Sequence, residues 1–329
     1  MVGNTFGFSR LKELFIQIRD FVRLDFGLSA YLYTAVFLII CCTVNYHFDL
    51  DDVFLEPLTG TFTGLVLYFL FYGVAYYGVS IPVLVLTGNG QKLKQPLFWI
   101  CSFAFILFIS LDAIMQIPEN WIHQLSLENS GYWARRTLRN WAHLIIWIPG
   151  FWLFLKIFQP SFSDGVYGIR WKAEDIKPYL AMLWIMIPLI AAASFLPDFQ
   201  NQYPVFKRII PYLPGQSYLE KWVALAAFEI SYVFSFISTE LMFRGGLALG
   251  MAAILGRQAI LPMVSVYMFL HFGKPMGESI SSVFGGYILG ILALENRNIW
   301  GGIFIHGCIA FLMDMAAAIQ LRSILFQDF

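Results

Sequence analysis

The sequence has few charged residues. Only 13% of its 329 residues are Asp, Glu, Lys or Arg, whereas 59% are hydrophobic and 18% are aromatic. A soluble globule of this length needs many more polar side chains to cover its surface. The composition therefore excludes an ordinary soluble domain. It indicates an all-α, polytopic membrane helical bundle whose first partner is the lipid bilayer.

The chain also lacks an excess of positive charge and a cysteine framework. Its 21 basic residues are balanced by 21 acidic ones, which leaves no basic face of the kind that nucleic acid requires. The cysteines fall within apolar runs and lack metal-ligand spacing: Cys41, Cys42, Cys101 and Cys308. We therefore expect no nucleic-acid partner, no cofactor and no cysteine-bound metal.

Long apolar runs are abundant. Eight or nine of them are long enough to cross about 30 Å of hydrocarbon at about 1.5 Å per residue. The cores of these predicted spans are residues 30–46, 60–86, 96–116, 141–158, 178–196, 221–243, 258–272, 276–294 and 300–320. The run 258–272 is short for a complete span.

Residues 1–29 differ from these spans because their apolar residues form only one stripe. The stripe follows helical spacing and has basic residues opposite it: Leu11, Leu14, Phe15, Ile18, Phe21 and Val22 against Lys12, Arg19 and Arg23. This pattern predicts an amphipathic helix lying in the membrane interface. The alternative is a helix packed on the protein itself.

Four regions follow from these patterns: the interfacial helix 1–29, a transmembrane region 30–177 without an assigned role, a transmembrane core 178–320 and a C-terminal tail 321–329. After residue 177, ionisable residues become frequent within the spans: Glu229, Glu240, Arg244, His271, His306 and Asp314. An ionisable side chain at membrane depth costs at least about 2.5 kcal/mol on insertion scales. Each of these residues is therefore a candidate for a functional site.

Helical geometry narrows these candidates. Glu240 and Arg244 are four residues apart, so on one continuous helix they can pair and offset each other's burial. Glu229 points in the same direction but lies roughly 16 Å along the axis, which prevents it from replacing Glu240. Taken singly, His271 and His306 are each more readily explained as packing residues than as catalysts.

Three motifs change that interpretation. "TELMFRGGL" (239–247) resembles the first motif of the CAAX protease and bacteriocin-processing family, also called CPBP or Abi, in which Glu-Glu-x-x-x-Arg is commonly followed by Gly. "YMFLH" (267–271) resembles the second motif, an aromatic residue four positions before a histidine. "NIWGGIFIHGCIAF" (298–311) resembles the third, whose histidine is ordinarily followed four residues later by asparagine. The resemblance covers about residues 178–320.

The resemblance implies an all-helical intramembrane endopeptidase. In that family the first glutamate of the first motif is the general base on a water molecule, and the histidines and the asparagine orient water and stabilise the oxyanion. By position, Glu240, His271 and His306 are the catalytic candidates and Arg244 supports them. The substrates would be membrane-anchored, prenylated or leader peptides.

Two family positions are substituted in this sequence. Thr239 stands in place of the catalytic first glutamate, and Ala310 stands in place of the asparagine. Threonine does not ionise near neutral pH, and the alanine side chain cannot form a hydrogen bond. The sequence therefore has the supporting half of the first motif without its base.

Three substitutes for the lost groups can be considered. Glu240 could serve as the base, although pairing with Arg244 would make it a poor proton acceptor. Asp314 could replace the asparagine, although it lies roughly 12 Å along the helix from His306. Glu240, His271 and His306 could bind zinc, although the arginine beside that carboxylate opposes it.

Two main hypotheses follow. The first is an endopeptidase homologue that cleaves a membrane-anchored peptide. The second is a non-catalytic pseudoprotease that acts as a membrane scaffold or binds a peptide, a lipid or the helix of a partner membrane protein. A transporter is a minor third alternative because buried Glu, Arg and His can relay protons. We expect a bacterial inner (plasma) membrane location, with an internal eukaryotic membrane as the alternative.

Overall fold

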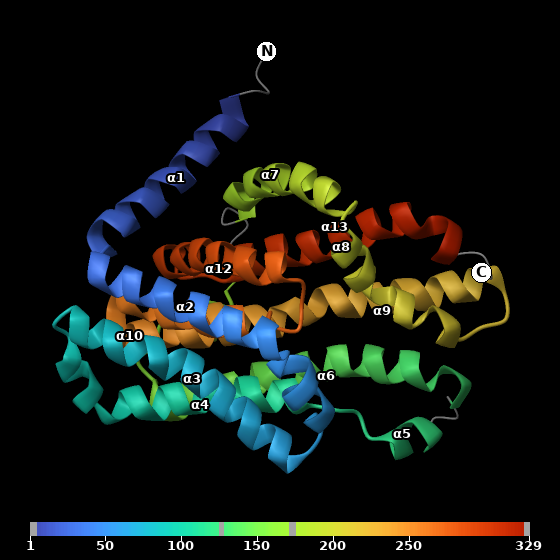
Figure 1. The fold of residues 1–329 in the computed structure, drawn as a ribbon, viewed down its shortest axis with the longest axis horizontal. Coiled ribbons are helices and arrows are strands. Elements are labelled where there is room, and N and C mark those ends of the chain that lie inside the picture. The colour runs from blue at the N-terminus through green and yellow to red at the C-terminus, as the bar shows by residue number, and fades with distance from the viewer. Residues whose placement is uncertain (1–4, 125–127, 171–175, 326–329) are drawn as a thin grey trace. The chain divides into compact units, whose positions relative to one another are not determined.

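The computed structural model describes residues 5–124, 128–170 and 176–325, and these are helical without any strand (Figure 1). Residues 1–4 of the predicted interfacial segment and 326–329 of the predicted tail lie outside the described residues. The longer helices are α1 Thr5–Asp25, α2 Leu28–Phe48, α3 Phe62–Leu86, α4 Pro96–Ile114, α6 Gly131–Phe158, α7 Lys177–Ala193, α9 Tyr218–Glu240, α12 Met276–Asn296 and α13 Trp300–Leu325.

Shorter helices connect these elements. They are α5 Glu119–Gln124, α8 Pro197–Gln202, α10 Met251–Leu255 and α11 Ile260–Phe269, with π-helical turns at η1 Asp51–Leu55 and η8 Leu241–Gly250 and a 3-10 turn at η9 Gly256–Ala259. The segments from α9 to α11 follow one another as a helical run over residues 218–269.

Within the described residues, seven helical segments are long and apolar enough to cross a membrane, which confirms an all-α polytopic membrane protein. The predicted spans 221–243 and 258–272 both lie in the run 218–269, and the predicted span 178–196 corresponds to the shorter apolar helix Tyr179–Ala193. The sequence predicted two separate spans here, and in the structure η8, α10 and η9 join them into one helical run.

The chain forms two compact units, each built from separate stretches of sequence. The first unit contains residues 1–115, 148–178 and 239–302, and the second contains residues 116–147, 179–238 and 303–329.

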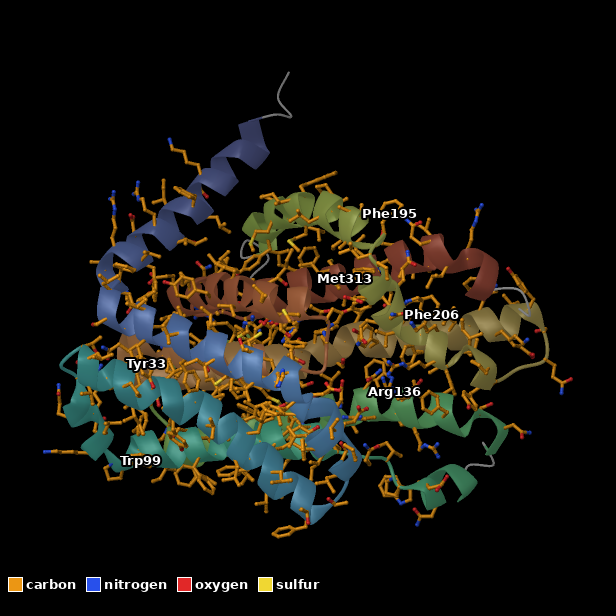
Figure 2. The ribbon with its side chains drawn as sticks, in the orientation of Figure 1. Tyr33, Trp99, Arg136, Phe195, Phe206 and Met313 are labelled. Carbon is orange, nitrogen blue, oxygen red and sulfur yellow. The ribbon has the colours of Figure 1, made fainter. Side chains whose placement is uncertain are left out.

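In the first unit, α3 packs against α2, α4 and α11, and α11 packs against α12. Figure 1 shows α2 running alongside α3. The buried side chains of one cluster come from three of these helices: Ala30, Val79, Val83 and Leu261. Tyr33 on α2, labelled in Figure 2, donates a hydrogen bond from its hydroxyl to the carbonyl of Gly78 on α3 at 3.0 Å. These contacts tie the N-terminal helices to α11, which carries the start of the second motif.

The predicted amphipathic helix is confirmed as a helix, α1. Phe21 is 1% exposed, meets Tyr287 of α12 edge to face and lies under the guanidinium of Arg257. Phe15 of the same helix is 67% exposed. One side of α1 thus packs on the protein, while the apolar side chain of Phe15 remains exposed. The location of α1 in the membrane interface stays a prediction.

In the second unit, α9 packs against α13 because a small residue allows close approach. A side chain at Gly307 would meet Val233 at 3.0 Å. Two apolar clusters accompany this pair: Ile190, Phe199, Tyr203 and Ala317, with Met313 packed on them, and Phe206, Ile209, Leu225 and Phe228. Met313 and Phe206 are labelled in Figure 2.

Candidate functional site

Glu240 and Arg244 form the buried ion pair that their spacing predicts. Glu240 ends α9 and Arg244 lies in η8, and Nη1 of Arg244 donates to Oε1 of Glu240 at 3.0 Å. Both side chains have no exposed surface. Mutual attraction offsets the cost of removing two charges from water, so the pair holds the first turn of η8.

The second carboxylate oxygen of Glu240 lies against Gly302, near the start of α13. A Cβ at residue 302 would overlap Oε2 of Glu240. Glycine is therefore required here by close approach, and Glu240 is enclosed on that side by the third motif. A carboxylate in this position is poorly placed to take a proton from water.

Tyr267 lies between Arg244 and His271. The Arg244 guanidinium carbon is 4.1 Å from the centre of the Tyr267 ring, and this ring meets the His271 imidazole at 4.6 Å between centroids. The first and second motifs therefore come together through a cation–π contact and an aromatic contact. The aromatic residue of the second motif, four positions before the histidine, is the sequence signal for this link.

The hydrogen bond of His271 defines its tautomer. Nδ1 of His271 lies 2.8 Å from the backbone carbonyl oxygen of Tyr267. A carbonyl only accepts, so Nδ1 carries the proton and, in the neutral ring, Nε2 is the acceptor nitrogen. His271 is 6% exposed. The ring is thus held in the form in which Nε2 can accept a proton.

The two substituted positions supply no replacement chemistry. Thr239 is half-buried at the end of α9, and Ala310 is buried in α13. A hydroxyl and a methyl group stand where the family resemblance places a carboxylate and an amide. Neither can act as a general base near neutral pH.

His306 belongs to the second unit. Its imidazole lies on the ring of Phe236 from α9, with 4.2 Å between ring centroids and a tilt of 35°. The histidine is half-buried. This aromatic contact orients the ring in the helix pair α9 and α13.

Asp314 has a structural task in the second unit. Its Oδ1 accepts a hydrogen bond from the backbone N–H of Val205 at 2.8 Å, and its carboxyl group also interacts with Glu229. Both residues are buried. Asp314 therefore ties the loop before α9 to α13.

Metal chemistry receives no support from the side chains. Within residues 5–124, 128–170 and 176–325, no three His, Cys, Asp or Glu side chains form a group that could hold a metal ion. The zinc alternative with Glu240, His271 and His306 thus remains a prediction without structural support.

Comparison with known proteins agrees with the motifs. Residues 221–312 match the family model described as type II CAAX prenyl endopeptidase Rce1-like. The resemblance to the CPBP family is thereby confirmed, and the matched segment contains all three motifs. Searches of curated proteins and of solved structures found no match.

Proposed function

We propose that this protein is a non-proteolytic member of the CAAX endopeptidase-like family that binds a membrane-anchored peptide. The observation that supports this proposal is the environment of the Glu240 carboxylate. The carboxylate is fully buried, bonded to Arg244 and enclosed by Gly302. The first motif therefore stabilises the helices, and the position that would hold the base is Thr239.

The ligand class follows from the matched family. Its description names a prenyl endopeptidase acting on CAAX sequences, and a peptide with a lipid anchor can enter a helical bundle from the bilayer. His271 and Tyr267 of the first unit offer hydrogen bonds and aromatic surface to such a peptide. Binding needs these groups to be in place but needs no activated water.

A cross-linking experiment tests this proposal. A farnesylated peptide ending in a Cys-aliphatic-aliphatic-Xaa sequence, with a benzophenone beside the cysteine, is added to proteoliposomes and irradiated. We expect a cross-linked product that contains the intact peptide, and much less product with the same peptide lacking farnesyl. Absence of farnesyl-dependent cross-linking would refute peptide binding, and a shortened peptide would refute the non-proteolytic assignment.

The second candidate function is an endopeptidase with a rearranged base. The observation that favours it is the His271 tautomer, because Nε2 of the ring is left as the proton acceptor. His271 would then take the proton of the attacking water in place of a glutamate. This alternative requires cleavage by the native protein that is lost in His271→Ala.

The chain is an integral membrane protein, because seven of its described helical segments are long and apolar enough to cross a bilayer. We propose the inner membrane of a bacterium, with an internal eukaryotic membrane as the alternative. Fractionation of the native cells with marker enzymes for each membrane distinguishes the two.

A further inference from the structure

The backbone that follows His271 is held by side chains from two other helices. The carbonyl of His271 accepts a hydrogen bond from the Ser279 hydroxyl of α12. The carbonyl of Phe272 accepts from Nδ2 of Asn45 at 3.2 Å, and the carbonyl of Lys274 accepts from the Tyr46 hydroxyl at 2.6 Å. Asn45 and Tyr46 both lie in α2.

Tyr46 and Ser279 form a short relay. Their hydroxyl oxygens are 2.6 Å apart. The two hydroxyl groups make three contacts: Tyr46 with the Lys274 carbonyl, Tyr46 with Ser279, and Ser279 with the His271 carbonyl. Each hydroxyl has one proton to donate. In a consistent arrangement, Ser279 donates its proton to the His271 carbonyl, and Tyr46 shares its proton between the Lys274 carbonyl and the Ser279 oxygen. The orientation of the serine hydroxyl toward His271 therefore depends on the tyrosine.

Asn45 ties the same segment to the start of the next connection. Its Oδ1 accepts from the backbone N–H of Asp51 at 3.3 Å while its amide donates to Phe272. The ring of Phe272 also meets Tyr46 edge to face at 6.2 Å. Asn45 is 1% exposed, so no water competes for these bonds.

We propose that α2 positions the candidate site, with Tyr46 acting through Ser279, and Asn45 through Phe272, to hold the backbone of His271. These are positioning residues and do not touch the ligand. The family match begins at residue 221, so α2 extends the site into the N-terminal region. The inference shares with the proposed function only the assignment of His271 to the site.

The tautomer of His271 is the property that this arrangement controls. The Nδ1 proton reaches the Tyr267 carbonyl only while the backbone at residue 271 keeps its place relative to the end of α11. If the Tyr46 hydroxyl is removed, Ser279 is free to turn and the Lys274 carbonyl loses its donor. The imidazole then exchanges between tautomers instead of holding the proton at Nδ1.

Nitrogen NMR of the full-length protein in lipid tests the proposal. Labelling with ¹⁵N-histidine gives signals from 5 histidines, and the signal that His271→Gln removes identifies residue 271. At about pH 8, where histidine is ordinarily neutral, we expect the native signal to be that of a ring protonated at Nδ1. Tyr46→Phe and Ser279→Ala should shift or broaden it, and Ser279→Thr should restore it.

Tyr33→Phe is the matched control, since it removes the same atom from the same helix, where the hydroxyl bonds to Gly78 instead. The proposal is overturned if Tyr46→Phe and Ser279→Ala leave the His271 signal native, if Tyr33→Phe changes it equally, or if the other histidine signals move as far. The NMR signal does not depend on a peptide, so failure of peptide binding would reject the proposed function and leave this inference standing.

Discussion

At the scale of single residues, Glu240 and Arg244 show what spacing alone could predict. Their spacing of four residues on a helix predicted that the two side chains pair, and the structure places Nη1 of Arg244 3.0 Å from Oε1 of Glu240. The contact of Glu240 with Gly302 could not be foreseen, because it joins residues that are 62 positions apart in sequence (302 − 240). The sequence showed Tyr267 only as the aromatic position of the second motif, and it did not reveal that the ring contacts Arg244 and His271.

Removal of one member of the Glu240 and Arg244 pair should be far more damaging than removal of both. Glu240→Gln leaves a buried guanidinium without its counter-ion, and we expect a loss of about 3–5 kcal/mol of stability. Glu240→Met combined with Arg244→Met restores an uncharged interior and should recover most of it. Thermal unfolding in detergent measures both variants. Equal damage by the single and the double variant would show that the ion pair does not stabilise the fold.

Asp51 gives the protein a pH-dependent stability. Its carboxylate occupies the space where a side chain at Gly273 would lie. Burial, together with the charges of Asp52, Glu56 and Asp49, raises the pKa of Asp51 to about 6. A raised pKa in the folded state means that the folded protein holds this proton more tightly than the unfolded chain does, whose value is near 3.8.

The stability from Asp51 should therefore be complete below about pH 4 and lost as the pH rises through about 6. Asp51→Asn removes this dependence, so we expect the variant to be more stable than the native protein at about pH 7.5 and the difference to vanish near pH 4. Asp198→Asn changes an exposed carboxylate and is the control. Melting temperatures at several pH values provide the measurement, and parallel curves for native protein and Asp51→Asn would disprove the effect.

At the scale of elements, the π-helical turn η8 could not be predicted from the sequence. Its apolar glycine-rich sequence, residues 241–250, resembled the end of a span. In the structure the glycines admit aromatic rings from α4, from α6 and from the segment after α6: Gly246 faces Phe105 and Phe151, and Gly250 faces Phe105 and Tyr167. Sequence patterns reveal apolar periodicity, but they do not reveal which rings approach a backbone.

A methyl group at Gly250 should disturb η8. It would lie 2.9 Å from Phe105 and 2.9 Å from Tyr167, both of which are fully buried. We expect Gly250→Ala to lower stability by about 1–3 kcal/mol through overpacking. Gly73→Ala in α3 is the matched control because nothing lies within 4 Å of its added methyl group. Denaturation of both variants in detergent decides the matter, and similar stabilities would count against close packing at η8.

At the scale of the whole molecule, composition and apolar runs were sufficient to predict an all-helical membrane protein. The number of spans was less accessible, because α7 is short and the run 218–269 passes through several helical types. The two units were not predictable either, since each draws on three separate stretches of chain. The grouping of these stretches into units depends on long-range packing, which the periodicity of apolar residues does not encode.

The most direct measurement is a cleavage assay in proteoliposomes with a farnesylated peptide ending in a Cys-aliphatic-aliphatic-Xaa sequence. Native protein is compared with the double variant Thr239→Glu and Ala310→Asn, which returns a carboxylate and an amide to the family positions. We expect no cleavage by the native protein and cleavage by the double variant, because only the variant has the carboxylate that can act as a general base at residue 239. Cleavage by the native protein that disappears in His271→Ala would contradict a non-proteolytic role.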